Sequence, residues 1–206
     1  MKILIACEYS GRVRDAFIAK GHDAMSCDLL PSDAPGPHYQ GDMFDLDLAS
    51  FDMIIAHPPC TYLSVSGLFW NKNNPKRAAK TDDALNFIKR IWELPVSKIC
   101  IENPVGCINT RLDFMPKPQY IQPYDFGEDA SKKTGLWTRG LPKLTGTTRI
   151  PGRQASANGK TCERWANQTD SGQNNLGPSP DRWKLRSTTY QGIANAMSEQ
   201  WNNLEN

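Results

Sequence analysis

Long apolar runs and paired cysteines are both missing from this sequence of 206 residues. The apolar runs are short, such as Met53–Ala56, whereas a helix that crosses a bilayer needs about 20 apolar residues. The six cysteines include no Cys-x-x-Cys pair, which argues against a disulfide framework or a zinc module. The first residues, MKILIACEYSG, predict a buried strand rather than a secretory signal. We therefore expect a reduced, monomeric cytoplasmic protein with no membrane span and no metal site.

An excess of basic over acidic residues is absent from most of the chain and is concentrated in one part of it. The net charge is only +2, but residues 131–186 hold 11 basic and 3 acidic side chains. Such a basic segment is typical either of contact with phosphates or of a solvated loop, and the sequence leaves both open. We divide the chain into a core at 1–148, a small basic segment at 149–186, and a C-terminal helix at 187–206 that returns to the core.

Short apolar strands alternate with amphipathic helices along the first half of the chain. A regular apolar spacing predicts helices after Gly11, over 81–92 and over 189–201, whereas 31–41 is expected to be a loop. The predicted strands are too short to alternate in polarity, and they lie at 2–7, 24–27, 51–56 and 97–101. This pattern predicts a doubly wound α/β fold, with a parallel sheet covered on both faces.

Polar and reactive residues follow several of these strands and would meet at one edge of the sheet, where such folds bind ligands. Gly11 opens a strand-to-helix turn, and Asp28 ends the next strand at a distance suited to the ribose hydroxyls of a nucleoside cofactor. A simple tight turn and a helix cap are the alternatives for these two residues.

Cys60 and Glu102 are the residues best suited to chemistry. Two prolines before Cys60 stiffen the loop, which favours an exposed nucleophilic thiol over a buried inert one. Glu102 ends a neighbouring strand, where partial burial would raise its pKa and make it a proton donor near neutral pH. A surface carboxylate or a helix cap is the alternative for Glu102.

In their order along the chain these motifs resemble those of the DNA (cytosine-5)-methyltransferases. The likeness covers residues 1–115 and returns weakly in the last helix. The motifs are Tyr9-Ser10-Gly11, Asp28, Gly41-Asp42, Pro58-Pro59-Cys60 with Ser64 and Gly67, and Glu102-Asn103-Pro104.

The resemblance implies a Rossmann-like fold that binds S-adenosyl-L-methionine and methylates cytosine in DNA. Cys60 would add to C6 of the base, and Glu102 would hold the base edge and protonate N3. The residues implied in cofactor binding are Tyr9, Ser10, Gly11, Asp28, Asp42 and Pro58. The residues expected to contact DNA are Ser64, Asn103, Lys133, Arg139 and Arg153, with Lys132 and Lys133 or Arg139 as sources of positive charge near the base.

The chain also departs from the family pattern. Cys7 stands where the family has Asp, His57 and Thr61 replace Gly and Gln around the Pro-Cys motif, and 149–186 is shorter than a usual recognition region. Two alternatives therefore stay open: the same chemistry on a free cytosine nucleotide or RNA, and a degenerate methyltransferase that only binds nucleic acid or a partner.

Overall fold

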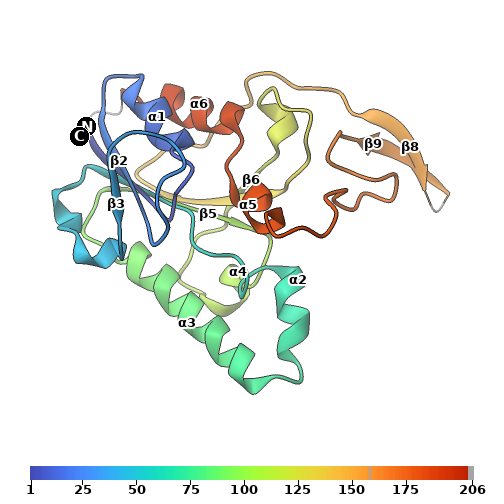
Figure 1. Ribbon diagram of the computed structural model, residues 1–206, viewed down its shortest axis with the longest axis horizontal. Coiled ribbons are helices and arrows are strands. Elements are labelled where there is room, and N and C mark those ends of the chain that lie inside the picture. Colours follow the sequence, from blue (N-terminus) through green and yellow to red (C-terminus); the bar gives the residue numbers. More distant parts are fainter. Residues whose placement is uncertain (158, 204–206) are drawn as a thin grey trace.

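A seven-stranded sheet with the order β3-β2-β1-β4-β5-β7-β6 forms the centre of the molecule (Figure 1). The structure is a computed structural model that describes residues 1–157 and 159–203. The first five strands in this order are parallel, whereas β7 runs antiparallel to both of its neighbours. The strands are β1 (Lys2–Ala6), β2 (Asp23–Asp28), β3 (His38–Gln40), β4 (Met53–Ala56), β5 (Lys98–Pro104), β6 (Gln119–Ile121) and β7 (Thr134–Arg139).

Helices cover both faces of this sheet. In Figure 1, α3 lies on one side of the strands, and α1 and α6 lie together on the other. The helices are α1 (Arg12–Ile18), α2 (Val65–Leu68), α3 (Pro75–Trp92), α4 (Ile108–Arg111), α5 (Arg182–Ser187) and α6 (Gln191–Gln200), and short 3-10 turns occur at Met43–Asp45, Leu48–Ser50, Phe69–Asn71 and Pro123–Asp125.

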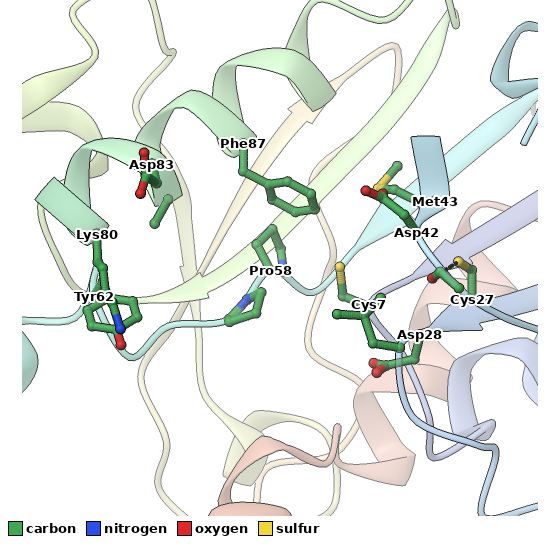
Figure 2. A pocket seen from close by; sticks show the side chains of 14 residues that line it. Cys7, Cys27, Asp28, Asp42, Met43, Pro58, Tyr62, Lys80, Asp83 and Phe87 are labelled. Atoms are coloured by element: carbon green, nitrogen blue, oxygen red, sulfur yellow. Dashed lines mark hydrogen bonds between the residues drawn. The ribbon is translucent and has the colours of Figure 1, made fainter. Parts of the chain in front are cut away.

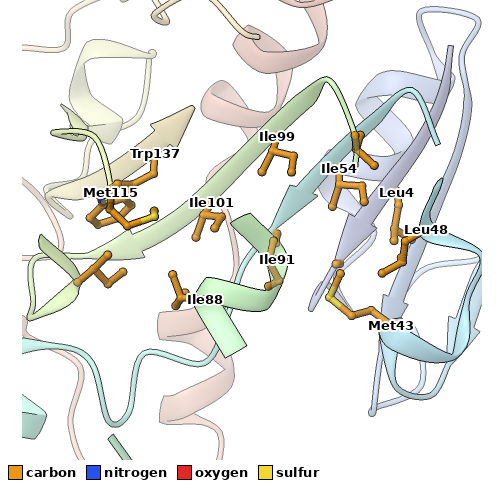
Figure 3. Packing of buried hydrophobic residues seen from close by; sticks show 14 of the residues in the cluster. Leu4, Met43, Leu48, Ile54, Ile88, Ile91, Ile99, Ile101, Met115 and Trp137 are labelled. Atoms are coloured by element: carbon orange, nitrogen blue, oxygen red, sulfur yellow. The ribbon is translucent and has the colours of Figure 1, made fainter. Parts of the chain in front are cut away.

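Two apolar clusters hold the helices to the sheet, because successive strand residues point to opposite faces. On the α3 face, Ile88 and Ile91 pack against strand residues that include Ile54 and Ile99 (Figure 3). The other cluster joins α1 and α6 to the opposite face, and its members include Ile3, Ile5, Val13, Phe17, Ile55, Cys100, Ile193 and Met197. Full burial of both sets explains why the strands are continuously apolar.

The expected doubly wound, Rossmann-like α/β fold is confirmed. The strand order reverses between β1 and β4, which creates the switch point beside which such sheets bind ligands. The prediction of a loop over 31–41 is wrong in part, because His38–Gln40 pairs with the end of β2 as an edge strand. This strand could not be predicted, since its three polar or aromatic residues carry no apolar pattern.

The basic segment 149–186 contains regular structure. It holds an antiparallel pair, β8 (Arg153–Ala157) and β9 (Lys160–Arg164), which projects beyond the main sheet (Figure 1). Trp165 anchors the segment to the core, because its ring stacks on Tyr124 with centroids 3.8 Å apart. The segment is therefore not simply a solvated loop. Residue 158 and the last three residues of the expected C-terminal unit lie outside the described residues.

No helix among the described residues is long and apolar enough to cross a membrane.

Candidate active site

A cavity of about 500 Å³ opens at the carboxyl edge of β1, β2 and β4. Asp28 and Asp42 lie at one end of it, and Pro58 and Phe87 supply apolar walls (Figure 2). Its size is within the range of small-molecule and cofactor sites. Three of the six residues expected to bind a cofactor, Asp28, Asp42 and Pro58, line this cavity.

The two carboxylates in the cavity are held by the backbone. Oδ1 of Asp28 accepts a hydrogen bond of 2.9 Å from the amide of Leu30, and Oδ1 of Asp42 accepts one of 3.0 Å from the amide of Phe44. Among the described residues, no hydrogen bond occupies the second oxygen of either carboxylate. Two fixed acceptors beside apolar walls suit a molecule that has hydroxyl or amine donors on a flat, largely apolar body.

Cys7 and Cys27 also line the cavity, but neither is prepared for chemistry. Burial, with the charge of Asp28 added, raises the pKa of Cys7 far above its usual value and the pKa of Cys27 to about 12. Both groups therefore stay protonated near neutral pH. Cys7 has a backbone φ of 56°, in the left-handed region, so the chain turns sharply as it leaves β1.

Tyr9, Ser10 and Gly11 do not line the cavity. The side chain of Tyr9 lies beneath α5, where its hydroxyl donates to the carbonyl oxygen of Lys184 at 3.0 Å and its ring lies 5.9 Å from that of Trp183. Ser10 donates to Glu8 at 3.2 Å, and Gly11 begins α1 with a φ of 74°. These three residues shape the turn after β1, and their role in cofactor binding stays a prediction.

Glu8 is a charged residue that sequence reasoning left without a role. It is only 4% exposed, and it accepts hydrogen bonds from the backbone amides of Val13 at 2.8 Å and Arg14 at 3.3 Å. The carboxylate therefore caps the N-terminus of α1, where a negative charge is favourable.

Cys60 is exposed, as expected for a nucleophile. Its carbonyl oxygen accepts hydrogen bonds from the amides of Leu63 at 3.1 Å and Ser64 at 2.9 Å, so the residue begins a tight turn. Desolvation of the sulfur by the surrounding protein raises the pKa of Cys60 above its usual value of 9.0, the charge of Lys132 opposes this rise, and the charge of Glu102 adds to it. These electrostatic effects mean that the thiol, the ammonium and the carboxylate share one region.

Glu102 is largely buried, with 15% of its side chain exposed. Burial acts to raise the pKa of Glu102, but the neighbouring His57, Lys132 and Thr134 outweigh it and lower this pKa below its usual value. The expectation of a raised pKa is therefore wrong, because it considered desolvation and not the polar groups that strand pairing brings to the carboxylate. Glu102 is ionised at neutral pH in this structure.

The imidazole of His57 was not predicted as part of the site. Its Nδ1 lies 3.5 Å from Oε2 of Glu102, at the outer limit of a hydrogen bond. The strand register explains the contact: Ala56 pairs with Ile101 across β4 and β5, so the next residues, His57 and Glu102, come side by side on the same face. Two polar residues that follow adjacent strands at equal register were the signal that could have identified this pair.

Asn103 lies in the site but faces the protein. It is 1% exposed, and its Nδ2 donates a hydrogen bond of 2.8 Å to the carbonyl oxygen of Pro58. The side chain thus links the end of β5 to the loop that carries Cys60. Ser64 follows Cys60 at the start of α2, with its hydroxyl 3.3 Å from that of Ser66. Binding of DNA by these two residues stays a prediction.

Of the basic residues proposed for this site, Lys132 is close enough for its charge to lower the pKa of both Cys60 and Glu102. Lys133 lies over the ring of Tyr120, 4.6 Å from its centroid. Arg153, on β8, forms an ion pair with Asp170. Neither of these contacts involves Cys60 or Glu102.

Arg139 does not lie at the site. It pairs with Ile99 near the beginning of β5, at the opposite end of the sheet from Glu102. Its guanidinium donates to the carbonyl oxygens of Trp92 and Leu94 at 2.7 Å and of Val96 at 2.8 Å. The reason is the reversed direction of β7: its first residues reach the site, and its last residue is carried away from it.

No protein-family model matches the chain, and no curated protein matches it. Among solved structures, the chain is similar to an E. coli protein described as a DNA modification methyltransferase encoded within a prophage, with 14% identity and a TM-score of 0.47 over 73% of this chain and 52% of that one. It is also similar to the Dnmt2 methyltransferase of S. pombe, with 16% identity and a TM-score of 0.37 over 66% of this chain and 48% of that one. The chain thus spans about half the length of each. Both TM-scores are below 0.5, so neither similarity carries a functional argument.

Proposed function

We propose that this protein transfers a methyl group from S-adenosyl-L-methionine to C5 of cytosine in DNA. The observation that carries the proposal is the placement of an exposed thiol, Cys60, and a buried carboxylate, Glu102, at the ends of adjacent parallel strands. A cavity with two fixed carboxylates opens beside them, and Pro58 in its wall belongs to the same loop as Cys60. The sequence motifs that resemble the cytosine methyltransferases supply these same residues.

Cys60 and Glu102 would act on opposite sides of one pyrimidine. Attack of the Cys60 thiolate forms a bond to C6, and the electrons of the C5–C6 double bond move toward C5 and N3. Glu102 accepts a hydrogen bond from the exocyclic amine and delivers a proton to N3, which makes C6 electrophilic enough to be attacked. The electron-rich C5 then takes the methyl group; a base removes the C5 proton, and the thiolate leaves C6 as the C5–C6 double bond forms again.

The residues of the cavity fit the proposed cofactor. Asp28 would accept hydrogen bonds from the two ribose hydroxyls, Asp42 would face the adenine amine, and Pro58 and Phe87 would enclose the flat ring. When bound, S-adenosyl-L-methionine supplies an electrophilic methyl group on a sulfonium. The neutral thiol of Cys7 stands where the family has a carboxylate, which predicts weaker binding of the cofactor's charged end.

The basic segment supports a polyanionic substrate. Arg186, on α5, is close enough for its charge to lower the pKa of Cys60. Trp183 and Arg182 on the same helix lie at the surface, where aromatic and guanidinium groups can bind unstacked bases and phosphates. A base in duplex DNA would have to leave the stack to reach Cys60, at a cost of about a few kcal/mol. A monomer acting in the cytoplasm completes the proposal.

Incorporation of label from S-adenosyl-L-methionine into DNA, RNA and dCMP tests this function. We expect label on DNA, as 5-methylcytosine, and a covalent adduct with DNA that contains 5-fluorocytosine. Cys60→Ser should abolish both, and Cys162→Ser should leave both intact because Cys162 lies on β9, away from the cavity. Label on RNA or dCMP alone would support methylation of cytosine but would exclude DNA as the substrate. An adduct that forms with Cys60→Ser would refute the mechanism.

A further inference from the structure

His57 is a buried imidazole without a well-formed hydrogen bond. Only 8% of its side chain is exposed, and within the described part of the chain neither ring nitrogen has a partner of good geometry. Buried polar groups are normally hydrogen-bonded, so an unpaired ring at this position requires an explanation. The explanation lies beside it, because Oε2 of Glu102 is only 3.5 Å from Nδ1.

The proposed reaction needs a proton that the resting carboxylate does not hold. Glu102 must protonate N3 of the base, yet His57, Lys132 and Thr134 keep its pKa below the usual value despite burial. The proton must therefore come from a neighbour. Cys100 is also near Glu102, but burial and the charge of Glu102 both raise the pKa of its thiol. Cys100 is therefore a poor proton donor.

Among the neighbours of Glu102, His57 is the best proton source. A lysine ammonium such as Lys132 is a weak acid, and the hydroxyl of Thr134 is weaker still, whereas imidazole exchanges protons near neutral pH. The backbone fixes the ring, since the amide of His57 donates to the carbonyl oxygen of Ala6 at 2.9 Å. A shift of a few tenths of an ångström would bring Nδ1 within ordinary hydrogen-bond distance of the carboxylate.

We propose that His57 is a positioning residue that supplies Glu102 with the proton it delivers to the pyrimidine. This inference rests on the proposed function. As Cys60 adds to C6, the imidazolium proton of His57 moves to the carboxylate of Glu102, and the resulting carboxyl group passes a proton to N3. When the thiolate leaves, N3 returns its proton to Glu102, and the carboxyl group passes it back to His57. No proton is gained or lost by the pair over the cycle.

Single-turnover methylation of DNA tests the proposal with His57→Asn, His57→Gln and His57→Gly. We expect His57→Asn to slow methyl transfer about tenfold to a hundredfold, with unchanged affinity for S-adenosyl-L-methionine. The pH above which the rate declines should move to a lower value, because Glu102 must then hold the proton alone. Added imidazole should restore part of the rate of His57→Gly. The matched control is His22→Asn, since His22 lies after α1 near the N-terminal amine and away from the cavity.

The outcomes separate this inference from the function on which it rests. Wild-type protein that neither methylates DNA nor forms the 5-fluorocytosine adduct would overturn both. An active wild type with His57→Asn and His57→Gln at full rate across the pH range would overturn the inference alone. Slow variants with a wild-type pH profile and no rescue by imidazole would also overturn it, because they would indicate a purely structural role. Unfolding curves and cofactor titrations identify any variant that fails to fold. The variants that do fold then decide whether His57 supplies the proton.

Discussion

Asn103 and Pro58 are joined by a hydrogen bond of 2.8 Å between Nδ2 and a backbone carbonyl oxygen, in a part of the site that excludes solvent. Through this bond the strand that carries Glu102 sets the position of the loop that carries Cys60. The distance between thiol and carboxylate is therefore controlled by a residue that need not touch the substrate.

Asn103→Ala should weaken methyl transfer more than it weakens folding. Loss of a buried amide that satisfies a carbonyl costs about 1–3 kcal/mol of unfolding free energy, and misplacement of reacting groups by a fraction of an ångström can slow a reaction about tenfold to a hundredfold. Single-turnover rates and urea unfolding measure the two effects. Asn109→Ala is the matched control, since Asn109 binds the carbonyl oxygens of Met115 and Pro116 instead. Equal rates for both variants would contradict the prediction.

Gly106→Ala should push the loops after β4 and β5 apart. A Cβ atom at this position would lie 2.0 Å from the carbonyl oxygen of Leu63, which accepts a hydrogen bond of 2.9 Å from the amide of Cys107. Overpacking of this kind costs about 1–3 kcal/mol, and formation of the Cys60 adduct should slow. Gly177→Ala has no atom within 4 Å of the added group and serves as the control. Unchanged adduct formation would show that the loops adjust without cost.

Lys132→Gln should slow alkylation of Cys60. Desolvation raises the pKa of this thiol, and the ammonium of Lys132 partly reverses the rise. Loss of the ammonium should therefore reduce the thiolate fraction severalfold near pH 8. Iodoacetamide labelling, with the Cys60→Ser signal subtracted, measures the rate. Lys133→Gln is the control because Lys133 lies over Tyr120. If both variants label at the wild-type rate, the charge of Lys132 does not reach the sulfur.

The pH dependence of stability should reveal the ionised state of Glu102. A carboxyl whose pKa is lower in the folded protein stabilises the fold above its usual value of 4.5, and this contribution is lost as the pH falls through the lower, folded value. The advantage of the wild type over Glu102→Gln in unfolding free energy should therefore fall as the pH drops below 4.5. Urea unfolding at each pH measures it, with the exposed Glu93→Gln as control. A difference that instead favours the wild type in acid would mean a raised pKa.

Asp28→Ala should weaken binding of S-adenosyl-L-methionine. Loss of hydrogen bonds to a charged acceptor costs about 1.5–3 kcal/mol, which corresponds to about a tenfold to a hundredfold rise in Kd. Calorimetric titration measures the affinity. Asp47→Ala provides a control, because Asp47 is exposed and does not line the cavity. If Asp28→Ala binds S-adenosyl-L-methionine as tightly as the wild type does, Asp28 does not bind the ribose.

The sequence was most informative where strands end. Asp28, Asp42 and Pro58 line one cavity, and Cys60 is exposed near Glu102, because the carboxyl ends of parallel strands necessarily share an edge. Apolar runs locate such ends with little ambiguity. Strand direction predicts the shared edge, and the family resemblance supplied the cofactor roles of Asp42 and Pro58.

Properties that depend on neighbouring strands were not accessible from the sequence. The lowered pKa of Glu102 comes from His57, Lys132 and Thr134, which all lie far from Glu102 in the chain and approach it only through strand pairing. The position of Arg139 depends on the antiparallel direction of β7, which no local pattern reveals. The polar strand β3 pairs through its backbone, so its side chains gave no signal.

The equal register of β4 and β5 limits how this chain can diverge. Deletion of a single residue within β4 would shift the register of the residues after it by one. Each of their side chains would then point to the other face of the sheet, and the imidazole of His57 would turn toward α3. Substitution can therefore tune the pair, but insertion and deletion in either strand abolish it. Descendants of this chain that vary in length should do so in the loops and in the β8–β9 hairpin, and keep both strands intact.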